Sequence, residues 1–346
     1  MRFERVRLEG LGRALADEIT TSEQLEARLE ASYARLGLSP GRLELMSGIR
    51  ERRFFPKGTR PSAIATAAAE DVLQRTGFDR SRIGLLIHAS VCRDFLEPAT
   101  ASVVHGALGL SPACMAYDLS NACLGVANGM VVAAQALEAG TIDAALIVSG
   151  EDGRDLIDET IAHVNAIQDG RVLRKALKQA YASLTIGGGG AAVLLTREGI
   201  GTSNHRLLGA TARAATEHVG LCEGDTKGTS GPLMETDSEA LLQAGNALAA
   251  STFAAFLNEQ EWTRDSIDHV ITHQVGAAHK KLLFSTLELD PAKDHPTVQF
   301  LGNVGSASLP LTLDHAATQD GLDADSTIAM LGIGSGLHSL MLHLTW

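Results

Sequence analysis

Short apolar runs alternate with longer stretches rich in alanine along most of the chain. Runs such as LLIHASV (85–91) and DAALIVSG (143–150) are apolar almost throughout, and helix-like stretches lie between them at 99–109 and 121–140. Strands that are apolar on both faces and alternate with helices are typical of a mainly parallel sheet with helices on both sides. The pattern therefore predicts an α/β protein.

One part of this pattern occurs twice. The segment FDRSRIGLLIHASV (78–91) resembles WTRDSIDHVITHQV (262–275), and DAALIVSG (143–150) resembles TIAMLGIG (327–334). The two pairs share an offset of 184 residues, since 262 − 78 and 327 − 143 give the same value. Two apolar strands at one offset indicate a duplicated structural unit.

The duplication divides the chain into two α/β halves, which we expect at 1–200 and 201–346. An alanine-rich stretch precedes the first repeated strand of each half, at 61–76 and at 239–257. We interpret the polar and basic stretch 151–185 as an insertion in the first half. No linker rich in proline or serine separates the halves, so we expect them to pack as one unit.

Composition and charge exclude several classes of protein. The 346 residues are 45% apolar and 20% charged, as in a globular chain rather than a disordered or fibrous one. With 41 acidic and 29 basic side chains the formal charge is −12, and an acidic chain lacks the basic face that nucleic acid requires. We expect no integral membrane segment, because no apolar run approaches the roughly 20 residues that a span needs.

The chain start and the cysteines indicate the compartment. The first residues, MRFER, lack the apolar stretch of a signal peptide. The four cysteines are Cys92, Cys114, Cys123 and Cys222. None of them lies in a CxxC motif, so they indicate neither a zinc site nor a disulfide framework. We therefore expect a cytoplasmic protein with no bound metal.

Cys123 has the sequence context of a nucleophile. It lies in YDLSNACLGVANGM (117–130), where an apolar strand ends and a helix of small residues begins, and the helix dipole there favours the thiolate. His273 and Asn303 also follow apolar strands or glycine turns, and sites assemble at the carboxyl ends of strands. Alone, each residue fits a core or turn position. Together they can form a thioester and stabilise an oxyanion.

Five motifs occur in a recognisable order: SGIRERRF (47–54), NACLG (121–125), His273-Gln274, GNVGSAS (302–308) and GIGSGLHS (332–339). This set resembles the thiolase superfamily, in particular the ketoacyl synthase III group of condensing enzymes. The resemblance implies a thiolase fold, a duplicated five-layer αβαβα sandwich. It also implies that Cys123 is acylated, that His273 and Asn303 complete the catalytic set, and that backbone at Cys123 and Gly336 forms the oxyanion hole.

Within that group, SVCRDFLEPATASVVHGALG (90–109) is most similar to OleA-type enzymes, which condense two long-chain acyl-CoA molecules head to head. The resemblance implies a homodimer in which Glu97 reaches the partner's active site as a base. Substrates would be acyl-CoA or acyl-carrier-protein thioesters, with no separate cofactor. Joining two unactivated thioesters requires removal of an α-proton, and a carboxylate in a dry pocket can perform that step.

Basic residues are candidates for contacts with the CoA phosphates or a carrier protein, or else form solvated charged faces. They are Arg50, Arg52, Arg53 and Lys280, with a further group at 171–178. Two other functions remain open. One is a decarboxylating 3-oxoacyl synthase III that uses a malonyl carrier protein, and the other is a non-catalytic subunit of a thiolase-fold heterodimer. The intact set of Cys123, His273 and Asn303 disfavours the second.

Overall fold

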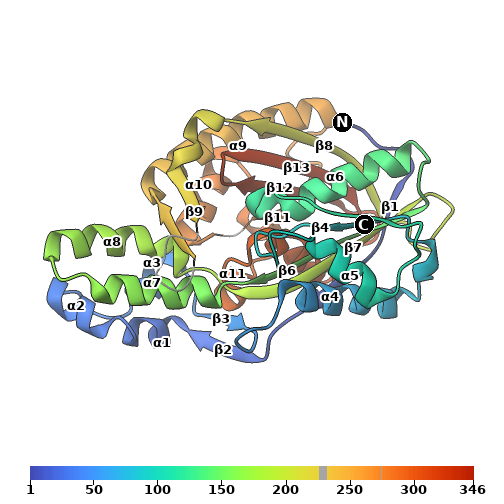
Figure 1. The fold of residues 1–346 in the computed structure, drawn as a ribbon. Coiled ribbons are helices and arrows are strands. Elements are labelled where there is room, and N and C mark those ends of the chain that lie inside the picture. The colour runs from blue at the N-terminus through green and yellow to red at the C-terminus, as the bar shows by residue number, and fades with distance from the viewer. Residues whose placement is uncertain (226–231, 274) are drawn as a thin grey trace.

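The computed structural model describes residues 1–225, 232–273 and 275–346 (Figure 1). The first half contributes the strands β1 (Val6–Ala14), β4 (Leu85–His88), β5 (Met115–Asp118), β6 (Ala144–Asp152) and β7 (Gly188–Arg197). The second half contributes β8 (Arg206–Ala214), β11 (His269–Thr272), β12 (Thr327–Gly334) and β13 (His338–Thr345). Within the described residues these nine strands form one sheet, in the order β11-β12-β13-β8-β1-β7-β6-β4-β5.

The two halves of this sheet repeat the same arrangement. In the first half β4 pairs in parallel with β6, which pairs antiparallel with β7. In the second half β11, β12 and β13 repeat these two pairings. Strand β11 begins 184 residues after β4, at 269 and 85, so the repeat predicted from the sequence is confirmed. The two half-sheets meet where β1 pairs with β8 at Arg7 and Arg206.

The expectation of a mainly parallel sheet is wrong. Only the pairs β4–β5, β4–β6 and β11–β12 are parallel among the described strands, and the remaining pairs are antiparallel. Apolar residues on both faces of a strand report burial on both faces, and they do not report its direction. Strands β7 and β13 are buried between helical layers and are therefore apolar although they run antiparallel to their neighbours.

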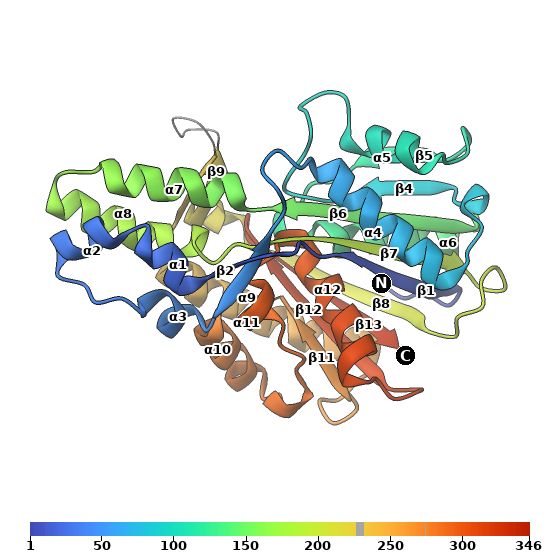
Figure 2. The same ribbon diagram turned by 90° about the horizontal axis from the view of Figure 1, so that it is seen from below.

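Helices enclose and separate the half-sheets to give five layers (Figures 1 and 2). The outer layers are α4 (Pro61–Thr76) with α5 (Thr100–Leu108), and α9 (Ser238–Gln260) with α10 (Ala277–Leu287). The central layer is α6 (Gly125–Glu138) with α12 (Ser308–His315). Three groups of buried side chains hold these layers together, one at each outer face and one around the central helices. The predicted duplicated five-layer αβαβα sandwich is confirmed.

A helical extension lies to one side of the sandwich, at the left of Figure 1. Its helices are α1 (Ser22–Ala27), α2 (Glu30–Leu36), α3 (Arg42–Ser47), α7 (Arg154–Ala166) and α8 (Gly170–Ser183). They share a small apolar core of their own. The stretch 151–185, expected to be an insertion, comprises the end of β6 and the α7–α8 hairpin. Smaller elements are β2 (Glu18–Thr21), β3 (Glu51–Phe54), β9 (Cys222–Asp225), β10 (Leu233–Thr236) and α11 (Val298–Leu301).

Helix α9 differs from what the sequence led us to expect. By length and composition this helix could cross a membrane, because its most apolar 18 residues have a mean hydropathy of 1.4. In the structure, 33% of these residues are buried. The expectation that no run of this kind exists is therefore wrong. In the fold, Phe253 and Phe256 of α9 pack against β11, β12 and β13, so its apolar residues contribute to the outer layer of the sandwich.

Candidate active site

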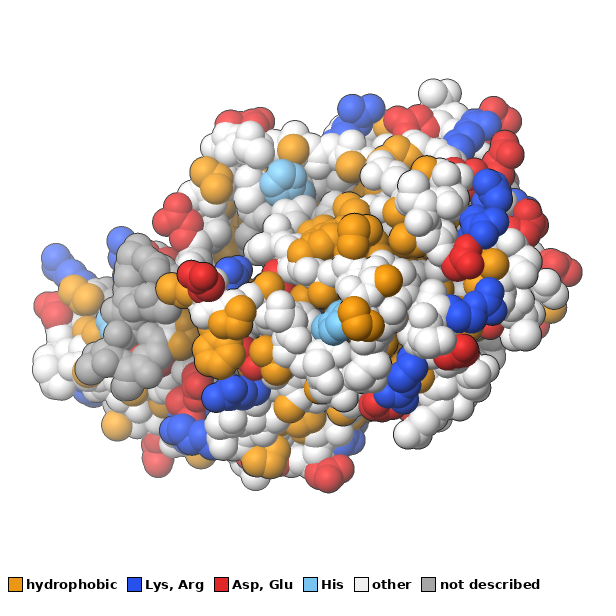
Figure 3. Space-filling view, turned by 45° about the vertical axis from the view of Figure 1, so that its right-hand side comes forward, with side chains coloured by type: hydrophobic (Ala, Val, Ile, Leu, Met, Phe, Trp, Pro, Cys, Tyr) orange, Lys and Arg blue, Asp and Glu red, His pale blue; other side chains and the backbone are white. Residues whose placement is uncertain are grey.

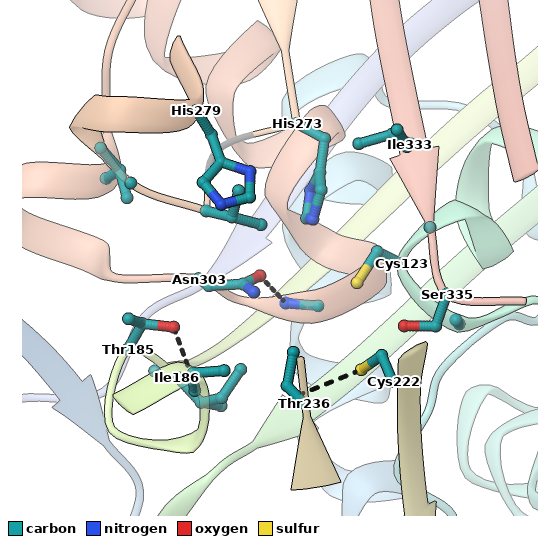
Figure 4. A pocket seen from close by; sticks show the side chains of 18 of the residues that line it. Cys123, Thr185, Ile186, Cys222, Thr236, His273, His279, Asn303, Ile333 and Ser335 are labelled. Atoms are coloured by element: carbon teal, nitrogen blue, oxygen red, sulfur yellow. Dashed lines mark hydrogen bonds between the residues drawn. The ribbon is translucent and has the colours of Figure 1, made fainter. Parts of the chain in front are cut away.

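A cavity of about 1960 Å³ lies where the sandwich meets the helical extension. Cys123, His273 and Asn303 all line it, and Figure 4 shows the three side chains converging on one space. Cys123 and Asn303 come from equivalent places in the duplicated fold. Cys123 precedes α6, Asn303 precedes α12, and His273 directly follows β11. The sequence prediction that strand ends of both halves meet at one site agrees with this geometry.

A sharp turn between β5 and α6 presents Cys123 to the cavity. Ala122 has a φ of +46°, a left-handed conformation that costs a non-glycine residue roughly 1–2 kcal/mol. Gly125 lets the helix start approach β4, because a Cβ there would lie 2.8 Å from the carbonyl oxygen of Ala89. The small residues after Cys123 therefore serve close packing, and the strained turn is held by its surroundings.

The Cys123 thiol is not held as a thiolate, contrary to the expectation from the helix dipole. Burial, with smaller contributions from the Glu151 carboxylate and the nearby Cys222, raises its pKa to about 12. Desolvation of the charged form outweighs the favourable dipole of the helix start. The resting nucleophile is therefore a thiol, and its proton must leave when a thioester carbonyl is attacked.

His273 is 7% exposed, and neither ring nitrogen has a hydrogen-bond partner among the described residues. Burial, with a smaller contribution from His279, lowers the pKa of His273 to about 4. The ring is therefore neutral at physiological pH, with one N–H donor and one lone pair that no described residue occupies. Buried polar atoms without partners are costly, and their presence here is typical of a binding site.

Asn303 is oriented by its own turn. Its Oδ1 accepts a hydrogen bond from the Gly305 N–H at 3.0 Å, shown in Figure 4, so the amide offers its Nδ2 as a donor. The backbone of Asn303 is tied to the start of β7, because its N–H donates to Thr185 O and its carbonyl accepts from Gly187 N, both at 2.9 Å. His273 and Asn303 together present fixed donors beside Cys123.

Glu97 lies outside this arrangement in its own chain. It is exposed and does not line the cavity, although Cys92, Asp94 and Leu96 of the same loop do. The loop exposes large apolar side chains, with Leu96 95% exposed. In this conformation Glu97 is therefore not part of the cavity lining around Cys123 of its own chain.

Two family models and several known proteins match the chain. Residues 117–215 match the 3-oxoacyl-[acyl-carrier-protein] synthase III family, and residues 257–346 match its C-terminal domain. The acyl-CoA:acyl-CoA alkyltransferase of Shewanella oneidensis is 39% identical over 353 residues, with 100% of both chains covered. The chain belongs to the acyl-CoA:acyl-CoA alkyltransferase (OleA) family. The 3-oxoacyl synthase III of Natranaerobius thermophilus is more distant, at 26% identity over 94% of each chain.

A solved structure of the OleA family has the same fold. It is a Cys-to-Ser variant of Xanthomonas campestris OleA with bound lauric acid and lauroyl-CoA. That structure matches with a TM-score of 0.94 at 36% identity, covering 99% of this chain and 100% of that chain. The predicted thiolase fold and the predicted family are confirmed.

Several residues of this OleA-family site were not singled out in the sequence. Cys92 and Cys222 line the cavity, whereas Cys114 is buried in the outer core. His279 and Glu151 also line it. Glu151 follows the apolar run of β6, so its place at a strand end is a signal that could have identified it. Gln274 lies outside the described residues.

The turn after β12, where the resemblance implied part of a backbone oxyanion hole, forms a wall of the cavity that Cys123 also lines. Gly334, Ser335 and Leu337 line the cavity, and Gly336 lies between them with a φ of +111°. This is a backbone conformation that glycine adopts readily. Figure 4 shows Ser335 close to Cys123.

The four basic candidates for CoA contacts differ in their placement. Lys280 lines the cavity, and its Nζ lies 2.5 Å from Oδ2 of the buried Asp294. Arg50 is exposed, and Arg53 donates to the carbonyl oxygen of Ala16 at 2.9 Å. The basic residues of 171–178 line a separate shallow groove with Arg35, and Lys178 also lines the cavity.

Arg52 cannot contact CoA, and this candidate is corrected. It is fully buried and donates at 3.0 Å to the Ser22 hydroxyl and to the carbonyl oxygen of Leu184. Burial lowers its pKa to about 10. Side chains along β3 alternate between half-buried and buried positions, and Arg52 points inward. There it joins the helical extension to the sandwich.

We expect Arg52→Ala to destabilise the protein, because it leaves the buried Ser22 hydroxyl and Leu184 carbonyl without their donor. The loss should be roughly 2–3 kcal/mol of unfolding free energy, measured by urea titration. Arg50→Ala is the matched control at an exposed neighbour and should lie within about 0.5 kcal/mol of the unsubstituted protein. Equal stability of the two variants would contradict a structural role for Arg52.

No metal site is evident in the part of the chain that the structure describes. These residues contain no group of three or more His, Cys, Asp or Glu side chains placed to hold an ion. His269 lies at the start of β11, just before His273, and its Nδ1 is 3.0 Å from Nε2 of His295.

Proposed function

We propose that this OleA-family protein condenses two fatty acyl-CoA molecules head to head to give a 2-alkyl-3-oxoalkanoate. The observation that supports this most is the convergence of Cys123, His273 and Asn303 on one large, largely apolar cavity. Its 1960 Å³ is about twice the upper end of the 300–1,000 Å³ typical of small-ligand sites. A cavity of that size has room for more than one acyl chain.

The first half-reaction loads an acyl group onto Cys123. The sulfur attacks the thioester carbonyl, the bond to the CoA sulfur breaks, and the thiol proton leaves with the departing CoA as its free thiol. Neutral His273 has a lone pair available to accept this proton in transit. The backbone N–H of Cys123 and the turn at Gly336 hold the oxyanion of the tetrahedral intermediate.

The second half-reaction forms the carbon–carbon bond. Glu97 removes an α-proton from a second acyl-CoA, and donors on His273 and Asn303 hold the enolate oxygen. The enolate carbon attacks the acyl carbonyl at Cys123, and the Cys123 sulfur leaves and is reprotonated to the thiol by the proton that Glu97 removed. The product is a 3-oxoacyl-CoA, which hydrolysis converts to the acid. CoA enters only as part of the substrate, so no separate cofactor is required.

The proposal includes a homodimer in which Glu97 acts in the partner's cavity. Glu97 does not line the cavity of its own chain, while its loop exposes Val91 and Leu96. The neighbouring β5 is an edge strand whose Met115 and Tyr117 are exposed, and such an edge can pair with a second copy. Hydrophobic side chains also gather on the middle of the face in Figure 3. Exposed apolar patches of this kind mark interfaces.

We also place the protein in the cytoplasm. Its four cysteines are free thiols, and a catalytic thiol is maintained in a reducing compartment. Its proposed substrates, CoA or acyl-carrier-protein thioesters, would have to be supplied by fatty acid metabolism in the same compartment.

The experiment that tests this function supplies one long-chain acyl-CoA to the purified protein, with and without a malonyl thioester. We expect the condensed product from the acyl-CoA alone, detected by liquid chromatography and mass spectrometry. Product that forms only when the malonyl thioester is added would show a decarboxylating 3-oxoacyl synthase III instead. No product and no acylated Cys123 under either condition would favour a non-catalytic subunit.

We expect Asn303→Ala to separate the two half-reactions. Loss of one donor to a developing oxyanion commonly costs about 10²–10³ in rate. The variant should therefore still acylate Cys123, followed by intact-protein mass, while condensation slows by about that factor. An equal slowing of acylation would assign Asn303 to loading rather than to the enolate.

A further inference from the structure

Glu151 is a buried carboxylate in the cavity wall that the proposed mechanism does not use. Glu151 is 4% exposed and lies near the end of β6, where it pairs with Gly189 of β7. Three backbone N–H groups donate to its two oxygens, from Val91, Cys92 and Ser306. The Ser306 hydroxyl lies 2.7 Å from Oε1 and 2.6 Å from the carbonyl oxygen of Ala89. A carboxylate that is so fully occupied is a poor proton acceptor, so its contribution must come through what it holds.

On one side Glu151 holds the start of the loop that carries Glu97. Its Oε1 accepts the Val91 N–H at 2.9 Å, and its Oε2 accepts the Cys92 N–H at 3.1 Å. These two amides lie a few residues before Glu97. The same loop ends at α5, where the Asp118 carboxylate accepts the N–H groups of Thr100 and Ala101 at 2.9 and 2.8 Å.

On the other side Glu151 holds the turn that carries Asn303. Its Oε1 accepts the Ser306 N–H at 3.2 Å and lies 2.7 Å from the Ser306 hydroxyl. Ser306 and Gly305 belong to the turn whose amide orients the Asn303 side chain. Gly305 passes so close that a Cβ there would lie 3.1 Å from Oε1.

A chain of buried hydroxyls links this contact to the far end of the Glu97 loop. The Ser306 hydroxyl lies 2.8 Å from that of Ser149, which lies 3.1 Å from that of Ser90. Ser90 lies 3.0 Å from Nε2 of His88, whose Nδ1 is 3.6 Å from Asp118. Hydrogen bonds therefore connect the Asn303 turn to Ser90 and His88, and His88 lies beside the Asp118 carboxylate that holds the far end of the loop.

We propose that Glu151 is a positioning residue for condensation, which fixes the loop of Glu97 and the turn of Asn303 relative to each other. Glu97, the base, and Asn303, the enolate donor, lie on separate segments of the chain. Glu151 accepts hydrogen bonds from both of these segments. This inference rests on the proposed function, because it assigns Glu97 and Asn303 the roles given there. A displacement of about 1 Å between reacting groups can cost on the order of 10²-fold in rate.

Glu151→Gln tests this with little change in shape. Glutamine keeps an oxygen for the donors at Oε1 but places an NH₂ against the Cys92 N–H, so the two donors face each other. Glu9→Gln is the matched control. Glu9 is also a buried carboxylate, with hydrogen bonds from the N–H groups of Thr202 and Ser203, but it lies in β1 and does not line the cavity.

Three measurements on these variants decide the proposal. Hydrogen–deuterium exchange should rise in both 91–98 and 303–307 for Glu151→Gln, and in neither segment for Glu9→Gln. Single-turnover condensation, started from protein already acylated at Cys123, should slow by about 10- to 10²-fold for Glu151→Gln only. Alkylation of Cys123 by iodoacetamide should become faster in Glu151→Gln, because removing a negative charge lowers the pKa of the thiol.

Unchanged exchange in the two segments, or a condensation rate equal to that of Glu9→Gln, would overturn the proposal. If the unsubstituted protein forms no condensed product, the proposed function fails, while exchange and alkylation still decide what Glu151 holds. If Glu151→Gln does not fold, Ser306→Ala replaces it, since that change removes the contacts of the Ser306 hydroxyl with Glu151, Ser149 and the Ala89 carbonyl but keeps the Ser306 N–H. Exchange should then rise in 303–307, and exchange unchanged there would contradict the network.

Discussion

Cys123→Ala should abolish both acyl loading and condensation while the protein keeps its fold. Alanine is smaller than cysteine by one sulfur and fits the small-residue turn between β5 and α6, so thermal unfolding should shift little. Without the sulfur no thioester can form, and incubation with a long-chain acyl-CoA should add no acyl mass to the protein. Release of free CoA should fall to the background rate of hydrolysis.

Two other cysteines provide controls for this result. Cys114→Ala alters a buried thiol in the outer core and should retain loading. Cys222→Ala alters a cavity residue near Cys123 and should also load, because Cys222 forms no bond to the acyl group. A Cys123→Ala protein that accumulates condensed product would exclude the covalent mechanism.

Glu97→Gln should stop the reaction after the first half. Glutamine keeps the shape and hydrogen-bonding capacity of the side chain but cannot accept the α-proton. The variant should load Cys123, release one CoA per site, and form almost no carbon–carbon bond. General base catalysis commonly contributes about 10²–10⁴-fold, so condensation should fall by at least that range. Full activity would remove the case for non-decarboxylative condensation.

Mixing the two variants tests where Glu97 acts. In a heterodimer of Glu97→Gln and Cys123→Ala, one cavity receives an intact Cys123 from one chain and an intact Glu97 from the other. Mixing should therefore restore activity that neither variant has alone. Failure to restore activity, with heterodimers demonstrated by native mass spectrometry, would place Glu97 in the cavity of its own chain.

The sequence predicted what depends on burial and on strand ends. The offset of 184 residues showed the duplication, because equivalent strands keep equivalent apolar positions. The positions of Cys123, His273 and Asn303 also predicted that they share one site, since each follows the end of a strand or precedes a central helix. The direction of β7 and β13 could not be predicted, because burial on both faces produces the same apolar pattern in either direction.

Features that depend on the third dimension were missed or misassigned. Arg52 looks like a surface arginine in SGIRERRF, and only the packing of the helical extension shows that it is buried. The thiolate expected at Cys123 depended on the helix dipole alone, whereas the depth of the cavity decides the pKa. Glu151 gains its role from contacts with residues about 60 and 155 positions away in the chain.

The most direct test of the central claim follows the carbonyl carbons of the substrate. Protein is given a single long-chain acyl-CoA labelled with ¹³C at the carbonyl, and the product is analysed by mass spectrometry before any decarboxylation. Head-to-head condensation predicts a 2-alkyl-3-oxoalkanoate that carries two labelled carbons, the ketone and the carboxyl, with two CoA released per product after hydrolysis. A product with one labelled carbon, or no product until a malonyl thioester is added, would contradict it.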